Sequence, residues 1–106
     1  MILENVRLGE PVKVIVNPKE GTINIIEKAL EFDLQDFIET IEELINGKKQ
    51  DEILEDTESN PVFIERYKDW IIFHLANSYM IFSIEDMKKL VEYVKNEREK
   101  YEGGEK

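Results

Sequence analysis

Residues 70–94, WIIFHLANSYMIFSIEDMKKLVEYV, decide the fold, because they contain the clearest strands and the clearest helix of the chain. Trp70–Ala76 is rich in aromatic and β-branched residues, which is typical of a strand. Asn77-Ser78 suits a tight turn, and Tyr79–Phe82 is a second short strand. The first half of the stretch therefore predicts two antiparallel strands joined by a hairpin.

The second half of the stretch predicts a capped amphipathic helix. Ser83, followed three residues later by Asp86, is a typical helix N-terminus. We expect the helix to fade through Asn96–Tyr101 and to leave a frayed tail at residues 102–106. Its predicted apolar stripe consists of Ile84, Met87, Leu90, Val91 and Val94.

The segments upstream extend this pattern. Pro61 opens a predicted strand at Val62–Tyr67, and Lys68-Asp69 is a two-residue turn between it and Trp70. Residues 48–60, KKQDEILEDTESN, are strongly acidic and weakly periodic, so we interpret them as a linker anchored by Ile53 and Leu54.

The N-terminal part of the chain predicts the same kinds of element. A short edge strand is expected at Ile2–Val6, and Val12–Asn17 alternates β-branched with polar residues, as strands do. Residues 17–21, NPKEG, have the composition of a turn. Residues 22–32 fit either two short strands or one helical stripe, and the repeat described below favours strands.

A second amphipathic helix is predicted at residues 34–46. Asp33 is a suitable N-cap, and Gly47 followed by two lysines suits the helix end. The apolar stripe of this helix consists of Leu34, Phe37, Ile38, Ile41, Leu44 and Ile45.

The two halves align when the chain is shifted by 50 positions. Pro11 then falls on Pro61, Asp33 on Ser83, and one helical stripe on the other. We therefore predict an α+β fold in one domain, residues 1–106, with antiparallel β-meanders and two amphipathic helices packed on one side. A strand-strand-strand-helix pseudo-repeat would occupy about 11–47 and 61–101. Coincidence between two ordinary β-then-α units is the alternative.

Composition restricts the class of protein. The chain has 106 residues, 42% of them hydrophobic, and no cysteine, which excludes disulfides and thiolate metal sites. The first ten residues, MILENVRLGE, do not have the pattern of a signal peptide, and no apolar run is long enough to span a membrane. We expect a cytoplasmic protein, with an Ile-, Glu- and Lys-rich composition of the kind seen in thermophiles.

The net charge of −10 is concentrated in one third of the chain. Residues 27–59 contain twelve acidic and three basic side chains, whereas residues 60–106 contain nine and eight. Such a block repels phosphate backbones and attracts basic partners. A purely solvating acidic surface is the simpler alternative, because charge blocks often have no other role.

Aromatic side chains suggest a second type of surface. Trp70, Phe73 and Tyr79 fall on adjacent predicted strands, and aromatics on a sheet can stack single-stranded bases. The nearby cations, Arg66 and Lys68, are balanced by acids, so packing in a core or a dimer interface is the competing interpretation. Strands followed by a capped helix are similar in layout to dimeric single-stranded-DNA-binding coactivator proteins, an analogy of topology without a shared motif.

The sequence gives little indication of catalysis. His74 is the single histidine and lies between two apolar neighbours, which is typical of a packed residue. The acids at 51–58 do not have the spacing of a calcium loop, and there is no phosphate-binding glycine motif. We therefore expect no enzyme, no metal and no cofactor.

The leading hypothesis is a non-enzymatic acidic protein that binds a basic protein partner, in its sharper form a nucleic-acid-mimicking inhibitor of viral or mobile-element type. The alternative is a dimeric, sheet-based binder of single-stranded nucleic acid that uses Trp70, Phe73 and Tyr79. The residues predicted to bind the basic partner are Glu31, Asp36, Glu39, Glu42, Glu43, Asp51, Glu52, Glu55, Asp56 and Glu58.

Overall fold

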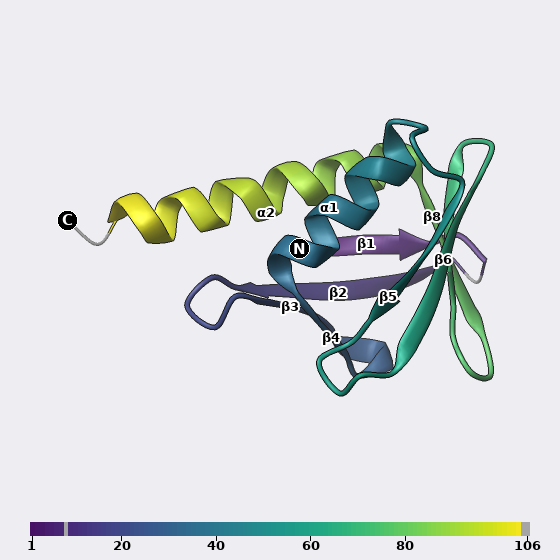
Figure 1. The fold of residues 1–106 in the computed structure, drawn as a ribbon, viewed down its shortest axis with the longest axis horizontal. Helices are drawn as coiled ribbons and strands as arrows, with labels where there is room; N and C mark the ends of the chain where they lie inside the picture. The colour runs from purple at the N-terminus through teal and green to yellow at the C-terminus, as the bar shows by residue number, and fades with distance from the viewer. Residues whose placement is uncertain (8, 105–106) are drawn as a thin grey trace.

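A computed structural model describes residues 1–7 and 9–104 and has an α+β fold of two four-stranded antiparallel sheets and two α-helices (Figure 1). The elements in chain order are β1 (Ile2–Asn5), β2 (Glu10–Asn17), β3 (Thr22–Ile25), the 3-10 turn η1 (Ile26–Lys28), β4 (Leu30–Asp33), α1 (Leu34–Ile45), β5 (Asp51–Glu55), β6 (Pro61–Tyr67), β7 (Trp70–His74), β8 (Tyr79–Ser83) and α2 (Ile84–Gly104).

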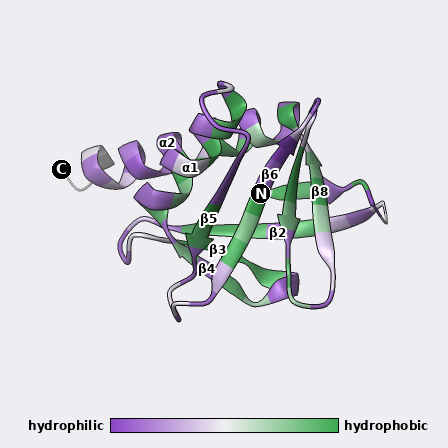
Figure 2. Cartoon of the chain, turned by 45° about the vertical axis from the view of Figure 1, so that its right-hand side comes forward, coloured by the Kyte–Doolittle hydropathy of each residue, from purple (hydrophilic) through white to green (hydrophobic). Residues whose placement is uncertain are grey.

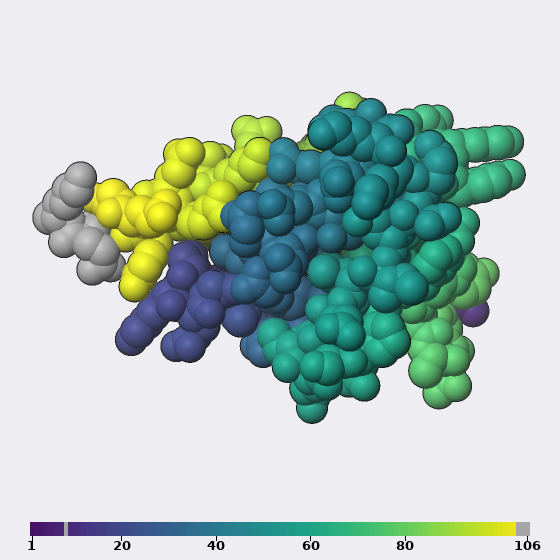
Figure 3. All heavy atoms as spheres, viewed as in Figure 1, coloured from purple at the N-terminus to yellow at the C-terminus, as the bar shows by residue number. Residues whose placement is uncertain are grey.

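Each sheet is a simple meander, with strand order β1-β2-β3-β4 in the first and β5-β6-β7-β8 in the second. In Figure 1 the strands of the first sheet run across the view, while those of the second run steeply at its right. Helix α1 crosses in front of the sheets, and α2 runs along the top and extends beyond them toward the C-terminus. Figure 3 shows α1 at the surface between α2 and the second sheet. Within the described residues, no helix is long and apolar enough to cross a membrane.

The structure has a repeat of strands followed by a helix, but each half contains four strands before its helix instead of the predicted three. Strand β4 ends at Asp33 and β8 ends at Ser83, 50 positions later. The side chains of both residues cap the following helix, accepting from the N–H groups of Asp36 and Asp86 at 3.0 Å in each case.

Reciprocal hydrogen bonds join the two halves. The Val6 N–H donates to the Ile81 carbonyl oxygen at 2.9 Å, and the Thr57 N–H donates to the Glu31 carbonyl oxygen at 2.8 Å. Glu31 and Ile81 are 50 positions apart. The last strand of each half therefore accepts a hydrogen bond from a residue just after the first strand of the other half. Asn5 strengthens the first junction, because its buried side-chain oxygen accepts from the Ile81 N–H at 2.9 Å.

One hydrophobic core fills the space between the sheets and the helices. Alternate residues of every strand point into it, together with the apolar stripes of both helices. The two phenylalanines at equivalent positions, Phe32 and Phe82, are both buried in it. Figure 2 shows these hydrophobic residues along the strands of both sheets, while the outer turns of α2 are largely hydrophilic.

Three local predictions are wrong. The predicted linker at residues 48–60 contains strand β5, which pairs with β6 and buries Leu54. A strand at the edge of a sheet tolerates many charges, and these obscured its alternation. Helix α2 continues to Gly104 instead of fading through Asn96–Tyr101, so it includes Glu102–Gly104 of the predicted frayed tail; residues 105–106 lie outside the described residues.

Phe73 is the third correction. The sequence predicts that Phe73 shares a nucleic-acid or dimer surface with Trp70 and Tyr79, but it is fully buried, with 0% of its surface accessible. Its ring packs edge-to-face on Phe82, with 5.6 Å between ring centroids, and also against Phe37 of α1. The period of two along β7 puts Phe73 on the opposite face from Trp70.

Candidate functional site: the outward face of strands β5 to β8

The outward face of the second sheet is apolar and partly exposed to solvent. On a half-solvated antiparallel sheet, polar residues are expected at these positions. Instead, large apolar and aromatic side chains occupy most of them, and exposed apolar patches of this kind mark interaction sites. We call this surface the aromatic face; it consists of Ile53, Phe63, Tyr67, Trp70, Ile72, His74, Tyr79 and Ile81.

The strand register arranges these side chains in rows across the sheet. Ile53 pairs with Phe63, Phe63 with His74, and His74 with Tyr79. The ring centroids of Phe63 and His74 are 5.3 Å apart, and those of His74 and Tyr79 are 6.3 Å apart. At the end of the row the Arg7 guanidinium lies over the Tyr79 ring, 4.4 Å from its centroid. Three rings and a cation thus form a continuous row on the surface.

His74 is held in this row by a carboxylate. Its Nε2 atom lies 2.9 Å from Glu65 Oε2 on the neighbouring strand. The imidazole is therefore partnered on one nitrogen and flanked by Phe63 and Tyr79. One ring nitrogen is thus satisfied, as expected for a packed histidine, but the side chain is 41% exposed instead of buried in the core.

Carboxylates border the aromatic face. Asp51 and Glu55 point outward from β5, the edge strand, and both are exposed. Asp51 pairs with Glu65 and Glu55 with Pro61, so each is a diagonal neighbour of Phe63. Within strands β5 to β8, all of which belong to the described residues, the outward positions contain no lysine or arginine.

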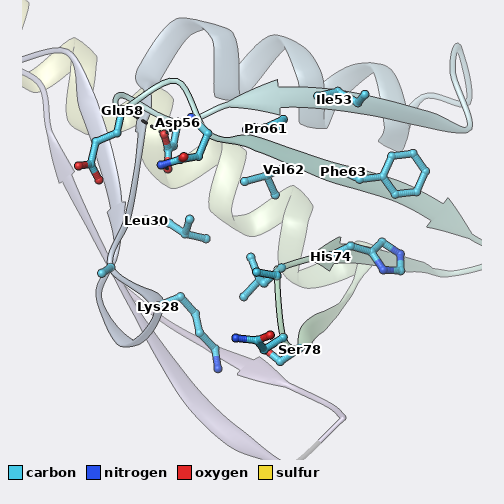
Figure 4. A pocket seen from close by; sticks show the side chains of 15 residues that line it. Lys28, Leu30, Ile53, Asp56, Glu58, Pro61, Val62, Phe63, His74 and Ser78 are labelled. Atoms are coloured by element: carbon cyan, nitrogen blue, oxygen red, sulfur yellow. Dashed lines mark hydrogen bonds between the residues drawn. The ribbon is translucent and has the colours of Figure 1, made fainter.

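An open groove continues the aromatic face around the end of the sheet. It has a volume of about 870 Å³ and lies between η1, the β5–β6 loop and the β7–β8 loop. Figure 4 shows Phe63 and His74 at one end, Lys28 and Ser78 on one wall, and Asp56 and Glu58 on the other. A ligand that covers Phe63 can therefore extend into the groove.

The ten acids predicted to bind a partner do not form one surface. Asp36, Glu39, Glu42 and Glu43 lie on α1, and Glu42 is paired with Lys95 of α2 at 2.7 Å. Asp51 and Glu55 border the aromatic face, and Glu58 is exposed on the groove wall. The remaining three, Glu31, Asp56 and Glu52, make contacts within the chain.

Two of these three stabilise the β5–β6 loop and its junction with the first sheet. Glu31 accepts a hydrogen bond from the Thr57 hydroxyl at 2.8 Å. Asp56 accepts from the backbone N–H groups of Asn60 and Glu58, both at 2.9 Å. The Asn60 N–H is the main cause that lowers the pKa of Asp56 below its ordinary value. Both carboxylates therefore have structural roles.

Glu52 faces α1 instead of a partner. Its side chain is 16% exposed, and its Oε2 atom is buried without a hydrogen-bond partner among the described residues. Burial raises the pKa of Glu52, and the neighbouring carboxylate of Glu43 raises it further. Lys49 Nζ, 3.7 Å from Glu52 Oε1, acts in the opposite direction.

Arg66 is not available to a ligand either. Its Nη1 atom donates to the carbonyl oxygens of Leu44 at 3.1 Å and Ile45 at 2.7 Å, which satisfies the C-terminal end of α1. The aromatic face consequently lacks one of the two cations that the sequence placed near it.

Sequence reasoning found part of this face and missed the rest. Trp70 and Tyr79 lie on it as predicted, whereas Phe63, Ile53, Ile72 and Ile81 were not proposed as site residues. The signal was present in the period of two: PVFIERY puts Phe63 opposite the buried Val62 and Ile64. Ile53 was missed because its segment was interpreted as a linker.

Among residues 1–7 and 9–104, no group of three or more His, Cys, Asp or Glu side chains is arranged to hold a metal ion. Comparison of the chain with protein-family models, curated proteins and solved structures finds no significant match. The chemistry of the aromatic face therefore carries the functional argument.

Proposed function

We propose that the protein is a non-enzymatic interaction module that binds a basic protein partner through the aromatic face. The observation that carries this proposal is the apolar surface of β5 to β8, which is bordered by the carboxylates of Asp51 and Glu55. Aromatic residues surrounded by a polar rim are the usual composition of a protein–protein interface. The carboxylates on the β5 border favour a basic contact at that side, because oppositely charged rims steer association.

A nucleic-acid ligand fits this face less well. Stacking of bases requires cations that follow the phosphate backbone. Arg66 caps α1, and Arg7 is stacked on Tyr79 at one end of the row. A phosphate backbone crossing Phe63 along the edge strand would meet the carboxylates of Asp51 and Glu55.

A second copy of the chain is also a weaker match. Each copy carries a net charge of −10, and the borders of the two faces would bring carboxylates together. A basic partner neutralises these carboxylates, whereas a homodimer concentrates them. The charge therefore favours a different protein.

The mimicry form of the proposal receives less support than simple docking. A nucleic-acid mimic needs several free carboxylates in one array, and Glu31, Glu42 and Asp56 are already bonded within the chain. Asp36, Glu39 and Glu43 on α1 remain as its candidate residues. We retain the basic partner and place its contact on the aromatic face.

Photo-crosslinking in cells of the source organism tests the proposal. Ile53 and Ile2 are a matched pair: they are 67% and 68% exposed, and each lies on an edge strand opposite an outward residue of the next strand. A photoreactive amino acid at position 53 should crosslink to a basic protein, and one at position 2 should not. The product should disappear when Phe63→Lys is added.

Two outcomes would contradict the proposal. Equal crosslinking from positions 53 and 2 would mean that the aromatic face has no special role. Crosslinking from position 53 to nucleic acid would support the sheet-based nucleic-acid binder instead.

A further inference from the structure

We infer that Phe63, together with Asp51 and Glu55, binds the guanidinium group of an arginine on the partner protein. This inference rests on the proposed function and adds to it the chemical group that the partner inserts. It depends on three observations: the strand register around Phe63, the exposure of its ring, and the contact that Arg7 makes with Tyr79 in the same row.

The register puts one aromatic ring between two carboxylates. Phe63 lies opposite Ile53 on the edge strand, and the outward residues on either side of Ile53 are Asp51 and Glu55. Diagonal neighbours of this kind have Cα atoms about 7–8 Å apart, within reach of a long side chain bound over the ring. Phe63 itself is 38% exposed, so one part of its ring is open to a ligand.

Both components of this arrangement, the ring and the carboxylates, favour a cation as the ligand. The face of an aromatic ring attracts a cation through its quadrupole, and carboxylates attract it through their charge. An anionic ligand would be repelled by both. A neutral apolar side chain would cover the ring but would leave Asp51 and Glu55 without a counter-ion.

The other end of the same row already contains this interaction within the chain. The Arg7 guanidinium lies 4.4 Å from the centroid of Tyr79, and Tyr79 is joined to Phe63 through the His74 ring. Arg7 comes from the β1–β2 connection in the first half of the molecule. Phe63 is the ring at the opposite end, and its neighbours on the edge strand are acidic.

Arginine fits this site better than lysine. A guanidinium is planar, so it can lie flat on a ring while its N–H groups bond to carboxylates at its edge. An ammonium group is compact and more strongly hydrated, and it cannot satisfy both contacts in one plane. The groove beyond Phe63 offers a path for the chain that carries the arginine, with Glu58 exposed on its wall.

Two peptides of equal charge and length test the inference: an acetylated alternating Arg-Ala heptapeptide and its Lys-Ala counterpart. Trp70 is the single tryptophan of the chain and lies on the aromatic face, so its fluorescence reports binding there. Isothermal calorimetry gives the affinity. The Arg peptide should bind about fivefold more tightly than the Lys peptide, because only the planar guanidinium lies flat on the ring while it bonds to the carboxylates.

Variants of Phe63 and of its neighbours show whether the preference for the Arg peptide depends on Phe63 and the two carboxylates. Phe63→Lys introduces the residue found at the equivalent position 13 and should reduce both affinities and remove the preference for arginine. Phe63→Tyr retains a ring and should retain the preference. Asp51→Asn with Glu55→Gln should weaken the Arg peptide. Ile15→Ser, on the outward face of the other sheet, should leave both affinities unchanged.

Equal affinity for the two peptides, an arginine preference that persists in Phe63→Lys, or no binding of either peptide at about 1 mM would overturn the inference. If crosslinking from position 53 still captures a basic protein in these cases, the proposed function stands without the arginine site. If that crosslinking also fails, both are wrong. Tighter binding of an oligothymidine than of either peptide would point to nucleic acid instead.

Discussion

The two halves of the molecule have the same architecture but different outward surfaces. The inward positions are apolar in both, with Val12 and Val14 equivalent to Val62 and Ile64. The outward positions diverge: Lys13, Thr22, Asn24 and Glu31 in the first half correspond to Phe63, Ile72, His74 and Ile81 in the second.

This difference separates residues needed for the fold from residues available for binding. The first sheet forms with polar residues at the positions where the second sheet has aromatic ones. The aromatic face is therefore not required by the architecture. An apolar surface that the fold does not need, and that costs solubility, is most simply explained by a partner.

The largest expected effect concerns the core that the halves share. Phe32→Ala and Phe82→Ala, at equivalent buried positions, should each lower the free energy of unfolding by about 3–5 kcal/mol. Phe63→Ala, on the aromatic face, should change it by less than about 1 kcal/mol. Urea denaturation followed by circular dichroism measures all three. A large loss in Phe63→Ala would show that the aromatic face is part of the fold.

The junctions between the halves should differ in strength. Asn5→Ala removes a buried acceptor from the Ile81 N–H and should cost about 2 kcal/mol. Thr57→Val at the other junction removes an exposed hydroxyl bond to Glu31 and should cost about 0.5 kcal/mol. Chemical denaturation of the two variants checks the order. Equal losses would mean that burial does not distinguish the junctions.

Glu52 should make the stability of the folded protein depend on pH. Its folded-state pKa is raised above the ordinary value of 4.5, so the folded protein holds this proton more tightly than the unfolded chain. Its contribution to stability is therefore lost as pH rises from about 4.5 through the raised pKa. Glu52→Gln should increase the melting temperature at pH 7 and reduce the decline above pH 4.5.

The exposed Glu55→Gln provides the control for Glu52, because it changes the same charge on the outward side of β5. It should leave the shape of the pH profile nearly unchanged. Identical profiles for the two variants would assign the effect to net charge instead of to the contact between Glu52 and Glu43.

A small change in stability is also expected from exchanging the outward surfaces. Phe63→Lys combined with His74→Asn gives the second sheet two residues that occur at the equivalent positions of the first. The unfolding free energy should stay within about 1 kcal/mol of the original, because outward positions contribute little to the core. Circular dichroism and crosslinking from position 53 should show a retained fold and a lost partner. A variant that fails to fold would break the comparison.

The sequence predicted most of the fold because its signals were local. The caps at Asp33 and Ser83, the helical stripes and the alternation along β2 and β6 each depend on neighbouring residues. Strand β5 was missed because its charges resemble a linker until its pairing with β6 is known.

The candidate site was harder to predict because it depends on which face of each strand is covered. Trp70 and Phe73 are close in sequence and both aromatic, yet one is exposed and the other is fully buried. The exclusion of Arg66 from the site depends on its contact with α1, 21 residues earlier in the chain. The period of two separates Trp70 from Phe73 but does not say which face is covered, and the contact of Arg66 is not visible in residue spacing.

The reciprocal hydrogen bonds at Val6 and Thr57 have a consequence for how the molecule could be assembled. Each half supplies the closing bond that the other half lacks, so a fragment cut in the connection after Gly47 would retain an open strand edge and an uncovered apolar face. Two such fragments, mixed as separate chains, should recombine into the intact fold. The single chain is then equivalent to a dimer whose two subunits have been joined, which leaves one of them free to acquire a different surface.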